Sequence, residues 1–156
     1  MTTEENTAAS DPQQEFAIHN IYLKDSSFES PNSPQVFQTN PKPAIQLTLA
    51  VNHTELQEGV YEVVLSVTVT AKENESTTFL VEIQQAGIFT LKGFDATGVN
   101  SMLGIYIPNI LFPYARETVS NMVTRGGFPP LLLEPVNFEA LYAQNQQPAA
   151  GSESTH

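Results

Sequence analysis

The sequence predicts an α+β domain in which a four-stranded antiparallel sheet is followed by two longer helices and a short C-terminal helix. Three observations lead to this prediction. Apolar residues alternate with polar ones as far as about Gly93, apolar residues recur with helical spacing after it, and both ends of the chain are nearly free of apolar side chains. Strands that come first and helices that come afterwards are typical of an α+β fold, and not of a doubly wound parallel sheet.

The first two predicted strands cover residues 16–28 and 45–51. Apolar side chains alternate regularly along the second of them. Along the first, the alternation slips between Ile18 and Ile21, as it does where a β-bulge inserts an extra residue. We therefore expect a bulge in the first strand.

The third and fourth predicted strands cover residues 61–71 and 79–91, and the polar residues 72–76 (KENES) between them favour a hairpin. Valine and other apolar side chains form one face of each strand. Glu62 and Glu82 occupy positions that point to the opposite face. The sheet should therefore have one buried face and one face that carries carboxylates.

Two helices are expected between Gly93 and Gly127. The first carries apolar side chains at positions i, i+3, i+4 and i+7 and should stop close to Pro108. The second covers about residues 110–122, with Pro113 in its first turn, where the missing N–H does little harm. Gly126 and Gly127 provide a left-handed end for it.

A short last helix is expected after Asn137, which can cap it and which precedes three apolar residues at helical spacing. Residues 1–14 and 144–156 are polar and small, so burial cannot offset the entropy lost when they become ordered. We therefore expect one folded domain over residues 15–143, with a disordered tail on each side.

The composition excludes several classes of function. In 156 residues the chain has 6 Lys and Arg against 17 Asp and Glu, so its formal net charge is −11. This is the wrong sign for binding nucleic acid or an anionic membrane surface. The chain has no cysteine, and its acidic first residues do not resemble a secretory signal. The sequence therefore predicts a soluble, cytoplasmic protein whose natural partners are basic.

No catalytic or metal site is predicted. His19 and His53 each lack a second histidine or a carboxylate at the spacing of metal ligands. The sequence contains neither a glycine-rich phosphate loop nor a G-x-S-x-G elbow. These patterns indicate a binding protein that is not an enzyme and needs no cofactor.

Two features suggest binding surfaces, and each has a plainer explanation that the residues alone leave open. Acidic residues concentrate in residues 1–30 and 55–82, each with a net charge of −5. They could form a dock for a basic segment or an ordinary solvated sheet face. Apolar residues in proline-bounded segments, such as Val36, Phe37 and Phe128, could cover the core or line a groove for an extended peptide.

Several long motifs closely resemble the SecB family of bacterial protein-export chaperones. They are residues 108–117 (PNILFPYARE), 123–131 (VTRGGFPPL), 135–141 (PVNFEAL), 22–31 (YLKDSSFESP) and 61–70 (YEVVLSVTVT). The resemblance extends over residues 16–142, which is nearly all of the expected domain.

This resemblance implies a homotetramer, built as a dimer of dimers, that binds unfolded precursor proteins without ATP and delivers them to the motor SecA. It also implies that the acidic sheet surface receives a basic tail of SecA, and that the zinc ion of that tail belongs to SecA. By their match to the motifs KDSSFE and FLVE, the residues expected to contact SecA are Asp25, Glu29, Leu80 and Glu82.

The resemblance also implies a groove for client proteins and an oligomer interface. Candidates for lining the client groove are Val36, Phe37, Phe138, Leu141 and Tyr142. The first helix would contribute to subunit association through Val99, Met102, Leu103 and Tyr106. The alternative hypothesis is an oligomeric domain that binds a small ligand in a closed apolar pocket.

Overall fold

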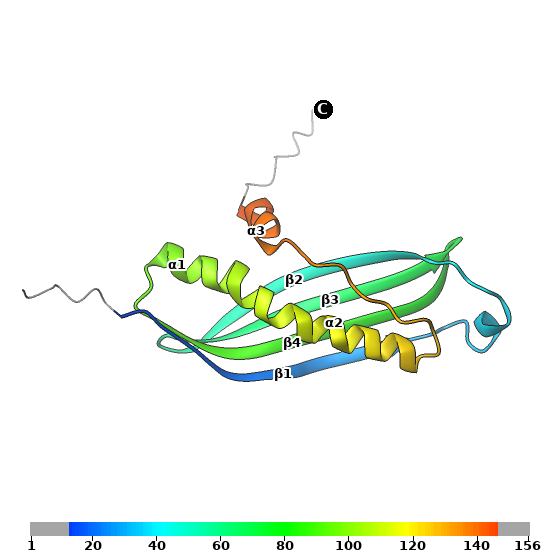
Figure 1. Ribbon diagram of the computed structural model, residues 1–156, viewed down its shortest axis with the longest axis horizontal. Helices are drawn as coiled ribbons and strands as arrows, with labels where there is room; N and C mark the ends of the chain where they lie inside the picture. The colour runs from blue at the N-terminus through cyan, green and yellow to red at the C-terminus, as the bar shows by residue number, and fades with distance from the viewer. Residues whose placement is uncertain (1–12, 147–156) are drawn as a thin grey trace, which may run out of the picture.

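The computed structural model describes residues 13–146 of the chain, and Figure 1 shows its strands and helices. The expected tails, residues 1–14 and 144–156, lie outside the described residues except at 13–14 and 144–146. In chain order the elements are β1 (Glu15–Glu29), the 3₁₀ helix η1 (Gln35–Gln38), β2 (Ala44–Gln57), β3 (Val60–Glu73), β4 (Ser76–Lys92), α1 (Ala96–Ser101), the π-helix η2 (Met102–Tyr106), α2 (Ile107–Arg125) and α3 (Phe138–Gln146).

The four strands form one sheet in the order β1-β4-β3-β2, and every neighbouring pair is antiparallel. This confirms the α+β class and the four-stranded antiparallel sheet. Since β1 and β2 lie at opposite edges, residues 30–43 must cross the end of the sheet between them (Figure 1). We call residues 30–43 the crossover segment.

Tight turns connect the three consecutive strands. Asn74 and Glu75, between β3 and β4, have φ angles of 49° and 66°, and two successive positive φ angles are typical of the type I′ turn that favours hairpins. The hairpin predicted there is confirmed. Between β2 and β3, Gly59 has a φ of 75°, which costs glycine little.

The register of β1 on β4 shifts between Ile18 and Asn20 and again between Leu23 and Asp25. The first shift confirms the bulge expected from the slip in alternation. The second shift was not predicted, because the polar residues around it show no clear alternation that a slip could interrupt.

The helical region differs from the sequence-based prediction at Pro108. Instead of stopping there, α1, η2 and α2 follow one another without interruption from residue 96 to residue 125. The backbone N–H of Ile107 bonds to the carbonyl of Met102 in the π-helix, so Pro108, which has no N–H, falls at the start of α2. Pro113 lies inside α2 and not in a first turn. The prediction of two separate helices is therefore corrected to one continuous run.

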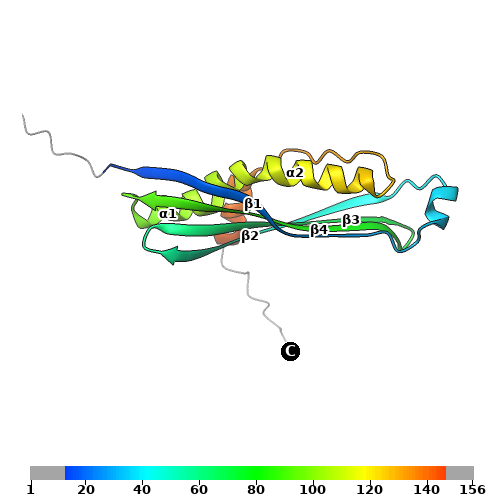
Figure 2. The same ribbon diagram turned by 90° about the horizontal axis from the view of Figure 1, so that it is seen from below.

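The helix α2 lies along one side of the sheet (Figure 2) and closes the core. Its buried residues Leu111, Ala115 and Val119 belong to the same apolar cluster as Val67 of β3 and Ile83 of β4. We call this side of the sheet the core face and the opposite side the open face. The helix α3 packs against η2.

An apolar groove and an acidic sheet face

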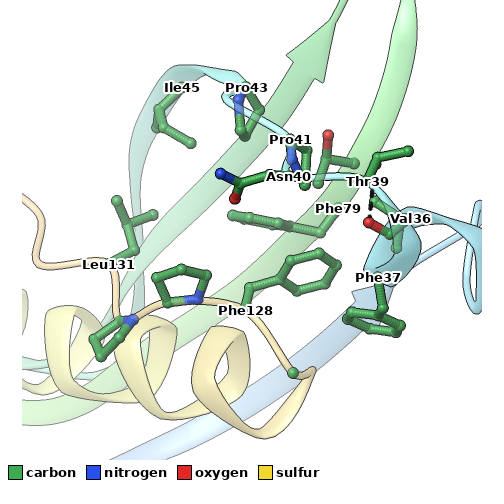
Figure 3. A pocket seen from close by; sticks show the side chains of 14 residues that line it. Val36, Phe37, Thr39, Asn40, Pro41, Pro43, Ile45, Phe79, Phe128 and Leu131 are labelled. Carbon is green, nitrogen blue, oxygen red and sulfur yellow. Dashed lines mark hydrogen bonds between the residues drawn. The ribbon is translucent and has the colours of Figure 1, made fainter.

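An apolar cavity of about 360 Å³ lies at the end of the sheet that the crossover segment spans (Figure 3). The crossover segment provides one wall, β4 contributes Thr78 and Phe79, and the segment after α2 contributes residues 127–131. Prolines and aromatic residues make up half of the lining, and no charged side chain takes part in it. The cavity therefore suits apolar side chains. We call it the groove.

Phe128 is the centre of an aromatic cluster that shapes the groove (Figure 3). Its ring centroid lies 5.1 Å from that of Phe79 and 5.3 Å from that of Phe37. Phe37 is 50% exposed, whereas Phe79 and Phe128 are buried. Gly127 has a φ of 92°, and a Cβ at this residue would lie 3.0 Å from the Phe37 ring. A glycine here therefore lets the Phe37 ring lie close to the chain after α2.

The crossover segment is attached to the hairpin between β3 and β4. The side-chain amide of Asn32 donates hydrogen bonds to the Ser76 hydroxyl at 2.8 Å and to the Thr77 carbonyl at 2.9 Å. The carbonyl of Asn32 accepts a bond from the N–H of Val36 at 2.8 Å. These contacts hold η1 so that Val36 is buried and Phe37 stands at the groove.

The five residues predicted to line a client groove are divided among three places. Val36 and Phe37 line the groove described above. Phe138 is buried in the core, with its ring 5.9 Å from that of Phe112. Leu141 and Tyr142 line a second cavity of about 240 Å³ beside His53, Leu103 and Gly104. Figure 1 shows α3, which carries these last three candidates, away from the crossover segment.

Two aromatic residues of the groove need the tertiary structure to be recognised. Phe79 is predicted as an inward-facing residue of the fourth strand, and it is one, but its ring also contacts Phe128 in the groove wall. For Phe128, the available signal is an apolar residue between glycines and prolines. That signal does not tell which other residues it meets.

The four residues predicted to contact SecA lie together on the open face. In the pairing of β1 with β4, Asp25 is opposite Gln84, Ser27 is opposite Glu82 and Glu29 is opposite Leu80. Glu82 is therefore the diagonal neighbour of both Asp25 and Glu29, and such neighbours are about 7–8 Å apart. The three carboxylates are exposed, and we call them the acidic strip.

A second group of charged residues lies farther along the open face. Both oxygens of the Glu62 carboxylate accept hydrogen bonds, one from the Lys24 ammonium at 2.8 Å and the other from the Tyr22 hydroxyl. The bonds from Lys24 and Tyr22 lower the pKa of Glu62 below its ordinary value. Burial, with the bonded Glu62 carboxylate as the next cause, raises the pKa of Tyr22 to about 12.

The four residues predicted for an oligomer interface differ in exposure. Leu103 is 2% exposed and belongs to the core of the subunit. Val99 and Met102 pack partly against that core. Tyr106 is 52% exposed, and its ring meets that of Phe16 edge to face at 5.6 Å. Of the four, Tyr106 offers the largest free surface.

The two histidines considered in the sequence analysis do not lie together. His19 is beside Thr90, and His53 is beside Tyr61. Within residues 13–146, no three His, Asp or Glu side chains come together in a way that could hold a metal ion. In the same part of the chain, none of the helices combines the length and the apolar character needed to span a bilayer.

Comparison with known proteins identifies the family. A family model described as preprotein translocase subunit SecB matches residues 9–149. "Protein-export protein SecB" of Nitrosococcus oceani is 55% identical over 148 residues, which cover 94% of this chain and 90% of that protein. The protein of the same name from Methylococcus capsulatus is 55% identical over 138 residues, or 88% and 89% of the two chains.

A solved structure supports the fold. It is a Mycobacterium tuberculosis SecB-like chaperone in complex with a ChAD peptide from the HigA1 antitoxin. The match has a TM-score of 0.65 at 19% identity and covers 78% of this chain and 90% of the other. The family model and the two relatives show that the chain belongs to the SecB family.

Proposed function

We propose that this protein is an ATP-independent chaperone for protein export, which acts in the cytoplasm. It binds unfolded precursor proteins in the groove, keeps them competent for translocation and delivers them to the motor SecA. The observation that carries the proposal is the uncharged groove of aromatic residues and prolines, found in a chain that is 55% identical to proteins named for protein export.

The groove can bind apolar side chains, which an unfolded chain exposes and a folded protein buries. Its apolar lining can take large apolar side chains, and its size limits it to a few of them at a time. Ile45 of β2 belongs to the lining, and β2 is an edge strand with unpaired backbone groups. An extended client segment could therefore add backbone hydrogen bonds to side-chain contacts. A binder that selects the unfolded state also draws the client population toward it.

The same features argue against the alternative of a closed pocket for a small ligand. Such a site encloses its ligand and orients it through a few well-placed polar groups. The groove is instead bordered by exposed residues, among them Phe37 and Pro130. An open wall of this kind suits a chain that enters and leaves on both sides.

The acidic strip is our candidate for the SecA contact. Asp25, Glu29 and Glu82 would attract the basic tail of SecA, and Leu80 lies among them, half-buried, to contact its apolar parts. Attraction between opposite charges at an exposed surface speeds association and selects partners. The zinc ion in this contact belongs to SecA.

We further propose that four chains assemble as a dimer of dimers. Both edges of the sheet are unpaired within the described residues, and unprotected edges invite pairing with another chain. Near the β1 edge, Leu23 and Tyr114 are exposed and line the same surface depression. Tyr106 is a further exposed aromatic residue for subunit contact. Sedimentation or light scattering should give four times 17.1 kDa, and a monomer would contradict the assembly.

Client binding is tested by diluting a denatured precursor protein into buffer with and without the chaperone. Aggregation should be suppressed, and equal aggregation in both samples would refute the proposal. Phe37→Ser should weaken the suppression, because Phe37 is exposed in the groove wall. The matched control is Leu132→Ser, which removes an apolar residue that is 74% exposed and does not line the groove.

Docking is tested with the triple charge reversal Asp25→Lys, Glu29→Lys and Glu82→Lys. Affinity for SecA should fall at low ionic strength, where exposed charges are least screened, while client binding and solution mass stay the same. The control reverses Glu58, Glu134 and Glu139, which are exposed acids outside the acidic strip. If both triple variants bind SecA as the parent protein does, the open face is not the docking surface.

A further inference from the structure

The group formed by Tyr22, Lys24 and Glu62 bridges three strands of the open face. Tyr22 of β1 is opposite Ala86 of β4, which in turn is opposite Val64 of β3. Ala86 is completely buried, and its small side chain leaves room for longer ones to pass above it. The side chains from β1 therefore reach Glu62 on β3, across two strand spacings of about 10 Å in total.

Every oxygen of the Glu62 carboxylate is used inside the protein. Oε1 bonds to Lys24 and Oε2 to Tyr22, and the side chain is only 17% exposed. The pair with Lys24 is the one ion pair found within residues 13–146. The carboxylates of Asp25, Glu29 and Glu82, in contrast, have no hydrogen-bond or ion-pair partner among the described residues. Of these four acids, Glu62 is therefore the one whose negative charge is neutralised within the protein and is not available to a binding partner.

The position of Glu62 would otherwise prolong the acidic strip. Along β4, Glu62 is opposite Ile88 and Asp25 is opposite Gln84, four residues earlier. Glu82 lies two residues earlier still on the same strand. Four residues of a strand span about 13 Å, so a free Glu62 would add a carboxylate past the Asp25 end of the strip. Lys24 neutralises that carboxylate and adds a half-exposed ammonium next to Asp25 in the chain.

We propose that Lys24 is a specificity-determining residue of the docking face, which limits the acidic strip to Asp25, Glu82 and Glu29 by engaging Glu62. A segment rich in Lys or Arg then finds attraction over the strip and no net attraction past its Asp25 end, so the register of the bound segment is set. This inference rests on the proposed docking function, because it concerns the same face.

The test replaces the ammonium and keeps the stem, as Lys24→Met. Two probes are used at low ionic strength, a hexa-arginine peptide and SecA. One exposed charge removed close to a bound cation, together with one carboxylate released, should tighten binding about fivefold. The control Lys92→Met makes the same change of net charge at the far end of β4 and should alter binding less than about twofold.

Glu62→Gln separates the release of Glu62 from the loss of positive charge. In the parent protein this substitution should weaken binding of both probes, because it leaves the Lys24 ammonium without its counter-charge next to the strip. Combined with Lys24→Met, it should abolish most of the gain. The inference is overturned if Lys24→Met gives no gain, if Lys92→Met gives an equal one, or if the double variant keeps the full gain. Should Lys24→Met fail to fold, as judged by circular dichroism, Lys24→Gln takes its place in every comparison.

The two probes distinguish this inference from the docking proposal. If the peptide binds more tightly to Lys24→Met but SecA binds no variant, Lys24 limits the strip and SecA is not its partner. If SecA binding responds to the triple charge reversal but neither probe responds to Lys24→Met, the docking face stands and the role of Lys24 is refuted.

Discussion

The two faces of the sheet are made by the same strands and differ in almost every physical respect. On β3, Val63, Leu65 and Val67 are completely buried on the core face. Glu62 and Ser66, which alternate with them along the strand, belong to the open face. Burial of apolar area stabilises the fold, whereas exposed polar positions rarely change stability by more than about 0.5 kcal/mol. The open face can therefore carry a pattern of charges for a partner without weakening the subunit.

The core face is not covered along its whole length, and this gives rise to the groove. The helix α2 ends at Arg125 and does not extend over the part of β4 from which the Phe79 side chain projects. There Phe128 and the crossover segment cover the sheet in place of a helix. These loops pack less completely against the sheet than a helix does, so a cavity remains at this end of the core, where it meets solvent.

The largest expected effect lies on the core face. Leu65→Ala should lower the free energy of unfolding by about 2–5 kcal/mol, because it leaves a cavity beside fully buried neighbours. Ser66→Ala, one residue away on the open face, should change it by less than about 0.5 kcal/mol. Urea denaturation measures both. Equal losses would contradict the division of the strand into two unlike faces.

The next largest effect concerns the boundary between core and groove. A Cβ at Gly126 would collide with the ring of Phe28, which stacks on Phe79 at 6.1 Å. Gly126→Ala should therefore cost about 1–3 kcal/mol of stability through overpacking and displace the aromatic cluster. Denaturation and the aggregation assay should respond together. A variant with unchanged stability and client binding would show that the cluster adapts freely.

A smaller effect is expected from the attachment of the crossover segment. Asn32→Ala removes the two bonds to Ser76 and Thr77 and should cost about 1 kcal/mol. Amide hydrogen exchange in residues 35–38 should become faster, and client binding should weaken. The matched control Asn52→Ala removes an exposed amide of β2 and should change none of these. Unaltered exchange in Asn32→Ala would mean that packing of Val36 alone holds the segment.

The smallest effects are those of pH on the open face. The pKa of Tyr22 is raised from 10.0 to about 12, so its contribution to stability is complete below pH 10 and is lost as the pH rises toward 12. Tyr22→Phe should remove this alkaline loss, followed as unfolding in urea at increasing pH. Tyr114→Phe, an exposed tyrosine without a bonded carboxylate, is the control. If the loss persists in full in Tyr22→Phe, neither the burial of Tyr22 nor its bond to Glu62 produces it.

At acid pH the sign is opposite. The pKa of Glu62 is lowered in the folded protein, so its contribution is present above the ordinary carboxyl pKa and is lost as the pH falls through the lowered value. Glu62→Gln should reduce this acid loss of stability, and Lys24→Met should reduce it in part. Identical acid transitions in all three proteins would show that the bonds of Glu62 to Lys24 and Tyr22 do not lower its pKa.

Much of the fold could be predicted from the sequence because it depends on neighbours in the chain. Alternation along residues 61–71 requires a strand with one buried face, and the slip near Ile18 requires a bulge. The apolar spacing after Gly93 likewise requires helices. Pro108 shows the limit of such rules, because a local π-turn let the helix continue through a residue that normally ends one.

The groove, and the contact of Tyr22 and Lys24 with Glu62 on the open face, depend on the tertiary structure. Whether Phe138 and Tyr142 face a groove or a core cannot be deduced from helical spacing, which is the same in both cases. That Lys24 reaches Glu62 follows from the strand order β1-β4-β3-β2. That Phe79 meets Phe128 follows from the packing of the segment after α2 against β4. Periodicity is a property of consecutive residues, whereas strand order and aromatic clusters depend on contacts between residues far apart in the chain, which only packing of the whole domain selects.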